Sequence, residues 1–132
     1  MKIERIDHFV LTVADPERTC EFYSRVLGLE VVEKDGRRAL RFGRQKINLH
    51  PSGKEIEPKA GRPTPGSGDF CLITATPLEE VQRHIEAAGV RIETGPVERN
   101  GALGRMTSVY FRDPDGNLVE VSKYLPGEGV AL

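Results

Sequence analysis

The chain has 132 residues, of which 30% are charged, and its formal net charge at pH 7 is −1. That length is typical of one domain with its own core. Because the charges nearly balance, nothing attracts the chain to nucleic acid or to an anionic membrane surface, and we expect neither partner. No apolar run approaches membrane-spanning length, and the charged N-terminal segment lacks the apolar region of a signal peptide. The two cysteines, Cys20 and Cys71, form no CxxC motif, so we expect free thiols in a cytoplasmic protein.

The first half of the chain predicts one helix among four strands. Apolar alternation over residues 6–13 indicates the first strand. Asp15 and Pro16 then predict the N-cap and the first residue of a helix, and Gly28 predicts its end. Three further strands are expected over residues 29–32, 38–42 and 46–50.

The same pattern returns after residues 51–68, a stretch rich in proline, glycine and charge that predicts a loop. A strand over residues 69–74 is followed by Thr76–Glu79, which has the sequence of a capping box. The residues that mark the strand start, the helix cap and the helix end recur 61 positions later in the chain. The corresponding pairs are His8 and Asp69, Asp15 and Thr76, Pro16 and Pro77, and Gly28 and Gly89. The remaining strands are expected over residues 90–92, 107–111 and 118–122.

This repetition predicts an α+β fold made of two βαβββ modules in tandem, whose curved mixed sheets surround a metal or substrate cleft. We place module one at residues 1–56, a linker at 57–67, module two at 68–125 and a tail at 126–132, all within a single domain.

Alternation along the strands divides their side chains between two faces. We expect one set to pack under the helices: Phe9, Leu11, Leu40, Phe42, Leu49, Val109, Phe111 and Val121. The opposite set should line the cleft: His8, Thr12, Arg41, Asn48, His50, Asp69, Cys71, Ser108, Tyr110, Glu120 and Ser122. The second set is rich in metal-binding and hydrogen-bonding groups, which favours a site over a solvated face.

The segment from Phe111 to Val121 contains a charged residue at an unusual position in a predicted strand. Asp113–Asn117 is dense in turn-forming residues, and Glu120 then places a carboxylate between two valines of the strand that follows. The simplest interpretation is that Glu120 is an exposed glutamate on a half-solvated strand. A functional role for Glu120 requires partner residues, and the candidates are His8 and the other residues of the cleft-lining set.

Three segments together resemble the vicinal oxygen chelate superfamily, which includes glyoxalase I, extradiol dioxygenases and bleomycin-binding proteins. They are residues 7–10, 22–29 and 113–120. Residues 42–50 and 53–60 are similar to the glyoxalase-domain-containing protein five group and to the bacterial virulence-protein glyoxalase homologues.

The resemblance implies a divalent metal held by the first and fourth strands of each module. Carried over by position, the ligands are His8, Asn48, Asp69 and Glu120, with His50 as a neighbour that could replace Asn48. Asp69 stands where the family usually has histidine, and Asn48 where it usually has Glu, Gln or His. Such oxygen and nitrogen ligands suit Mn²⁺, Fe²⁺, Ni²⁺ or Zn²⁺.

The function implied is lyase or isomerase chemistry on a small substrate with vicinal oxygens, in which the metal stabilises an oxyanion and Glu120 shuttles a proton. Arg41, Ser108 and Tyr110 are candidate substrate contacts. A metal-free ligand-binding protein of the bleomycin-resistance type is the alternative, as is an extradiol dioxygenase, which fits less well because Asp69 replaces its second histidine. We expect a homodimer, as in similar proteins, with residues 51–68 and 95–104 available for a lid or dimer contact.

Overall fold

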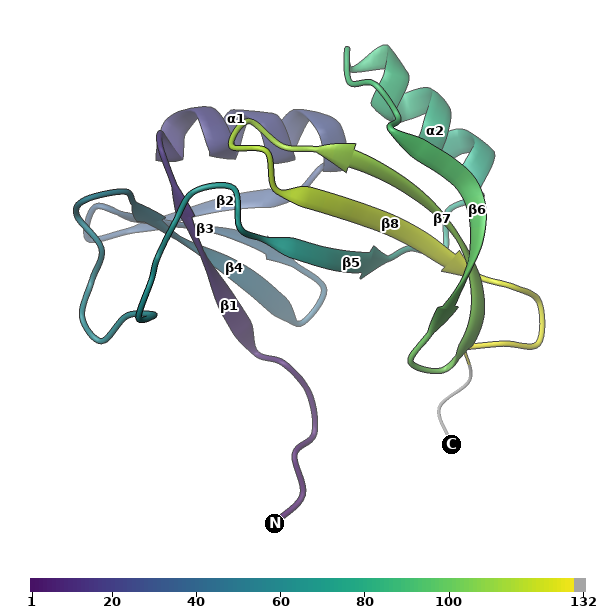
Figure 1. The fold of residues 1–132 in the computed structure, drawn as a ribbon, viewed down its shortest axis with the longest axis horizontal. Coiled ribbons are helices and arrows are strands. Elements are labelled where there is room, and N and C mark those ends of the chain that lie inside the picture. Colours follow the sequence, from purple (N-terminus) through teal and green to yellow (C-terminus); the bar gives the residue numbers. More distant parts are fainter. Residues whose placement is uncertain (130–132) are drawn as a thin grey trace. The chain divides into compact units, whose positions relative to one another are not determined.

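A computed structural model of the protein describes residues 1–129, which form two compact units (Figure 1). The first unit, which contains the strands and helix of module one, comprises Met1–Ser67 together with Pro114–Gly116. The second, which contains those of module two, comprises Gly68–Asp113 and the described chain from Asn117 onward. Residues 130–132 of the predicted tail lie outside the described residues. No helix in the described part is long and apolar enough to cross a membrane.

Module one is a four-stranded mixed sheet with one helix. Its elements are β1 (His8–Val13), α1 (Pro16–Leu27), β2 (Glu30–Lys34), β3 (Arg37–Phe42) and β4 (Gln45–Pro51). The strand order is β1-β4-β3-β2, in which β1 and β4 run parallel and the other neighbours run antiparallel. Buried side chains from α1, among them Phe22, Tyr23 and Val26, pack on one face of this sheet.

Helix α1 begins and ends where the sequence predicts. The Asp15 carboxylate accepts hydrogen bonds from the backbone N–H groups of Glu17 and Arg18, at 3.1 and 3.3 Å. Gly28 adopts the left-handed conformation, with φ 68°, and its N–H donates to the Ser24 carbonyl at 3.0 Å. The side-chain N-cap and the glycine stop are therefore both confirmed.

Module two repeats this arrangement. Its elements are β5 (Asp69–Ile73), α2 (Leu78–Ala87), β6 (Thr94–Gly101), β7 (Gly104–Arg112) and β8 (Leu118–Tyr124). The order β5-β8-β7-β6, with β5 and β8 parallel, matches that of module one strand for strand. The predicted fold of two βαβββ modules is confirmed.

The predicted capping box at Thr76 is wrong. Helix α2 begins at Leu78, and its N-cap is Pro77, which has no side chain able to accept a hydrogen bond. Thr76 is instead part of a tight turn before the helix, where its backbone N–H donates to the Thr74 hydroxyl at 3.1 Å. The helix also ends slightly early, because Ala88 is its C-cap and Gly89 follows in the left-handed conformation.

The strand expected over residues 90–92 is absent, and β6 lies further along the chain. The segment from Gly95 onward, which we expected to be a lid or dimer loop, is mostly that strand. β6 is the edge strand of its sheet, and its pairing with β7 is irregular between Thr94 and Val97. Pro96, which cannot donate a backbone hydrogen bond, is tolerated at such an irregular edge.

The two helix starts give a direct test of capping. Asp15→Ala should lower the free energy of unfolding by about 1 kcal/mol, because two backbone N–H groups lose their acceptor. Thr76→Ala should change it by less than about 0.5 kcal/mol, because the exposed Thr76 side chain caps nothing. Urea denaturation of both variants measures the difference, and an equal cost for the two would contradict these helix boundaries.

The predicted core is largely confirmed. Six of its residues are buried: Leu11, Leu40, Leu49, Val109, Phe111 and Val121. Phe9 and Phe42 are only half-buried, since both lie at the ends of their strands. Three residues assigned to the opposite face, Thr12, Ser108 and Ser122, are buried too, so this face is more enclosed than a solvated sheet face.

Candidate functional site

The pairing register places the predicted ligands at equivalent positions of the two modules. In the parallel pair of β1 and β4, His8 is opposite Lys46, and Asn48 lies two residues further along β4. In the parallel pair of β5 and β8, Asp69 is opposite Leu118, and Glu120 lies two residues further along β8. The alignment of Asn48 with Glu120 is therefore structurally sound.

Within each module these side chains lie on the sheet face opposite the helix, which we call the open face. In β4 the side chains of Ile47 and Leu49 are buried, so Asn48 between them points to the other side. In β8 the buried Val119 and Val121 place Glu120 on the open face in the same way.

A chain of hydrogen bonds ends on the Glu120 carboxylate. The Ser108 hydroxyl lies 2.6 Å from Glu120 Oε2 and 2.6 Å from the Ser122 hydroxyl, which in turn lies 3.2 Å from the Cys71 sulfur. Each of these three groups has one hydrogen to donate. A consistent assignment runs from the Cys71 thiol to Ser122, from Ser122 to Ser108, and from Ser108 to Glu120. Both serines are fully buried, so the carboxylate is held in a fixed orientation.

Cys71 is a thiol donor in this chain and not a thiolate. Burial of the sulfur raises the pKa of Cys71, and the nearby Glu120 charge raises it further, although the hydrogen bond with Ser122 acts in the opposite direction. Cys20 in α1 is also a free thiol, as expected from the sequence.

Tyr110 brings a hydroxyl to the same part of the open face. Its position in β7 is directly opposite Glu120 in β8. Arg99 Nε donates to the Tyr110 hydroxyl oxygen at 3.0 Å, and the guanidinium carbon lies 5.5 Å from the centre of the ring. Burial raises the pKa of Tyr110, and the Glu120 carboxylate also raises it, against the lowering effect of Arg99. The Tyr110 hydroxyl thus keeps its proton at neutral pH.

His8 is oriented by its sequence neighbour. Its Nδ1 lies 2.8 Å from Asp7 Oδ2, and because an ionised carboxylate can only accept, this contact assigns a hydrogen to Nδ1. The hydrogen bond holds the pKa of Asp7 below its ordinary value, with a further contribution from Arg5. Nε2 is then the nitrogen available to a ligand. Metal-binding histidines commonly have such a carboxylate partner.

The remaining predicted residues are less constrained. Asn48 is half-buried, between Val10 on β1 and Ala39 on β3 in the sheet register. The guanidinium of Arg41 is engaged by Glu30, which accepts from it at 2.7 and 3.1 Å. Asp69 is exposed. Within either module, residues 1–129 contain no group of three or more His, Cys, Asp and Glu side chains able to hold a metal ion.

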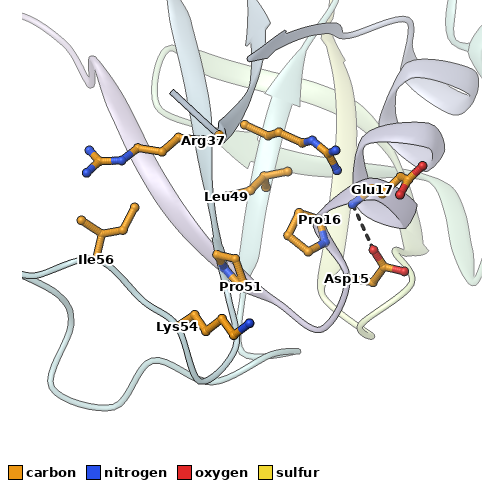
Figure 2. A pocket seen from close by; sticks show the side chains of 10 residues that line it. Asp15, Pro16, Glu17, Arg37, Leu49, Pro51, Lys54 and Ile56 are labelled. Carbon is orange, nitrogen blue, oxygen red and sulfur yellow. Dashed lines mark hydrogen bonds between the residues drawn. The ribbon is translucent and has the colours of Figure 1, made fainter. Parts of the chain in front are cut away.

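Module one contains two hollows that the sequence did not indicate. The first has a volume of about 420 Å³ and lies mainly over the open face, at residues 32–39, 46–50 and 56. The second, of about 310 Å³, lies between the start of α1 and the chain around Pro51 (Figure 2). Its charged lining residues are of both signs, namely Asp15, Glu17, Arg37, Arg38 and Lys54.

Comparison with known proteins gives the same fold and places the chain in a family. It is 57% identical over 126 residues to virulence protein STM3117 of Salmonella typhimurium, covering 95% of this chain and 88% of that protein. The crystal structure of STM3117 superposes with a TM-score of 0.93, at 56% identity, over 95% of this chain and 100% of that one. Glyoxalase domain-containing protein RDO1 of Mycosarcoma maydis is 47% identical, over 94% of this chain and 70% of that protein.

A lactoylglutathione lyase from Agrobacterium tumefaciens is a more distant structural relative. Its crystal structure is 30% identical, with a TM-score of 0.72 over 93% of this chain and 96% of that one. The Glyoxalase/Bleomycin resistance protein/Dioxygenase superfamily matches residues 5–121, which is most of the chain. The protein is a member of that superfamily.

Proposed function

We propose that this protein is a divalent-metal-dependent enzyme that acts by lyase or isomerase chemistry on a small substrate with neighbouring oxygen atoms. The observation that carries the proposal is the Glu120 carboxylate, fixed on the open face by the buried Ser108 hydroxyl, which in turn accepts a hydrogen bond from the buried Ser122 hydroxyl. A solvated surface glutamate would need no such support, whereas a carboxylate that binds a metal or moves a proton does.

The chemistry of the donor groups fits a hard or borderline metal ion. His8 offers Nε2, with Nδ1 engaged by Asp7, and Glu120 offers a carboxylate oriented by Ser108. These two residues would hold the metal, with Asp69, Asn48 and His50 as further candidate ligands, and such a set suits Mn²⁺, Fe²⁺, Ni²⁺ or Zn²⁺. When bound, the ion would supply Lewis-acid polarisation of the substrate oxygens.

Two residues of module two would carry out proton transfer and hydrogen bonding to the substrate. Glu120 is the candidate base, and the Tyr110 hydroxyl, which keeps its proton at neutral pH, is the candidate hydrogen-bond donor to a substrate oxygen. The 30% identity to a lactoylglutathione lyase supports lyase chemistry over oxygen activation. Arg41 is a weaker candidate substrate contact than the sequence suggested, because Glu30 already engages one edge of its guanidinium, through Nε and Nη2.

Elemental analysis of protein purified without chelator tests the proposal. We expect about one divalent metal per chain, removed by dialysis against EDTA and restored by Mn²⁺, Ni²⁺ or Zn²⁺ with a rise in thermal stability, since a ligand that binds only the folded state stabilises it. Protein that takes up no metal at any added concentration would refute the proposal.

A metal-free binding protein of the bleomycin-resistance type is the second candidate. It is favoured by Asn48, since an amide is a poor metal ligand at the position equivalent to Glu120. The same metal analysis separates the two, because this alternative predicts no metal and an unchanged protein after EDTA treatment.

We also propose a cytoplasmic homodimer. Two free cysteines are typical of a reducing compartment. Val10 and Ile73, on β1 and β5, are 44% and 55% exposed and offer apolar surface that a second copy would cover. Light scattering that gives the mass of one chain, or cell fractionation that places the protein outside the cytoplasm, would contradict the respective proposal.

A further inference from the structure

A small residue lies on the open face of module one, between longer side chains. Along β3 the side chains on this face are Arg37, Ala39 and Arg41, so an alanine lies between two long arginines. In the sheet register, Ala39 has Val32 on one side and Asn48 on the other. Ala39 is one of the residues that line the hollow of about 420 Å³, where its side chain fills little space.

The rim of this hollow is basic. Lys34, Arg37 and Lys46 all line it, from three different strands or strand ends. Among residues 1–129, none of these three forms an ion pair with a carboxylate, whereas the neighbouring Arg38 and Arg41 pair with Glu33 and Glu30. Asp35 supplies negative charge at the edge, which leaves the rim with net positive charge.

The direction of Arg37 supports this description. Figure 2 shows its side chain extending away from Asp15 and Glu17, on the side where Ile56 lies. Its guanidinium therefore remains available to a ligand, and it offers the planar fork that binds carboxylate and phosphate oxygens.

The floor of the hollow is apolar and carries two hydrogen-bonding groups. Val32, Ala39 and Ile56 provide apolar surface, while Asn48 and His50 add polar atoms from β4. A basic rim over a partly apolar floor suits a small molecule with an oxyanion at one end and an apolar body at the other.

We propose that this hollow is a binding site for a small organic oxyanion, of the carboxylate or phosphate class, held by Lys34, Arg37 and Lys46. The floor of this site includes Asn48 and His50, two of the further candidate metal ligands, so the inference rests on the proposed function and deepens it by naming the class of small molecule that the open face binds. The titration below uses metal-free protein, so a failure of anion binding and a failure of metal binding are distinguishable.

Nuclear magnetic resonance titration of EDTA-treated protein at low ionic strength tests this site without any metal. The probes are benzoate, its neutral isostere benzamide, and phenylphosphonate. We expect both anions to shift backbone amide signals of residues 32–39 and 46–50, and benzamide to bind at least about tenfold more weakly, since one charge-assisted contact accounts for that factor. The tighter of the two anions identifies carboxylate or phosphate as the preferred class.

Two variants and a control sharpen the test. Arg37→Gln should weaken anion binding at least about tenfold, and Ala39→Leu should abolish it by filling the hollow. Arg18→Gln on α1 removes the same charge from the helix over the opposite face, and should leave binding unchanged. The site is refuted if neither anion binds, if benzamide binds equally well, or if Arg18→Gln weakens binding as much as Arg37→Gln.

Discussion

Replacing Glu120 with glutamine is expected to lower the affinity for divalent metal by at least about a hundredfold, since loss of an outer-sphere partner alone costs 10–100-fold. Glutamine has nearly the same shape, and its amide oxygen can still accept the hydrogen bond from Ser108. The open face of module two should therefore keep its structure while losing the charge that a metal requires. Calorimetric titration of the EDTA-treated protein with Mn²⁺ or Zn²⁺ gives both affinities.

Glu98→Gln is the matched control for this experiment. Glu98 lies on β6 of the same module, where it forms an exposed ion pair with Arg105 at 3.4 Å. Its replacement removes the same charge from the module and should leave the metal affinity within about twofold, because exposed pairs contribute little. If both glutamine variants bind metal as the original chain does, Glu120 is not a ligand.

Replacing Asn117 with alanine is expected to lower the free energy of unfolding by about 2–4 kcal/mol, because several buried polar groups lose a partner together. The Asn117 side chain is 1% exposed. Its Nδ2 donates to the Asp113 carboxylate at 2.8 Å, and its Oδ1 accepts from the Gly68 N–H at 2.7 Å. One amide thus connects the turn before β8 to the start of module two.

Asn100→Ala provides the comparison, because Asn100 is an exposed residue near the end of β6. Its loss should cost less than about 0.5 kcal/mol. Urea denaturation followed by circular dichroism measures both variants, and a similar small cost for Asn117→Ala would show that the buried network contributes no net stability.

Much of the fold could be predicted because the signals that set the ends of its helices are local in sequence. Asp15 and Gly28 determine the ends of α1 through backbone geometry that neighbouring residues supply, and the recurrence of such signals revealed the second module. The errors lie where tertiary pairing outweighs local signals. Gly95 and Pro96 have the sequence of a loop but belong to an edge strand, and Thr76 has the sequence of a cap but precedes Pro77, which is the N-cap of α2.

The candidate site was predictable in part for a similar reason. Strand alternation correctly assigned Asn48 and Glu120 to the open faces, since the period of two is a property of the chain itself. The support that Asp7 gives to His8, and the line of hydroxyls behind Glu120, depend on rotamers and on partners far apart in sequence. The hollow above Ala39 likewise depends on side chains from three strands, which no single stretch of sequence reveals.

Pulsed electron paramagnetic resonance of the Mn²⁺-loaded protein tests the metal proposal most directly, because it detects nitrogen atoms bound to the ion. The chain has three histidines, His8, His50 and His84, so each can be replaced in turn. We expect imidazole nitrogen coupling in the original protein, in His84→Ala and in His50→Ala, and its loss when His8→Ala is combined with His50→Ala. Absence of coupling in His50→Ala, or coupling that persists in the double variant, would contradict the assignment of His8 as a metal ligand, because His50 is the other candidate imidazole ligand.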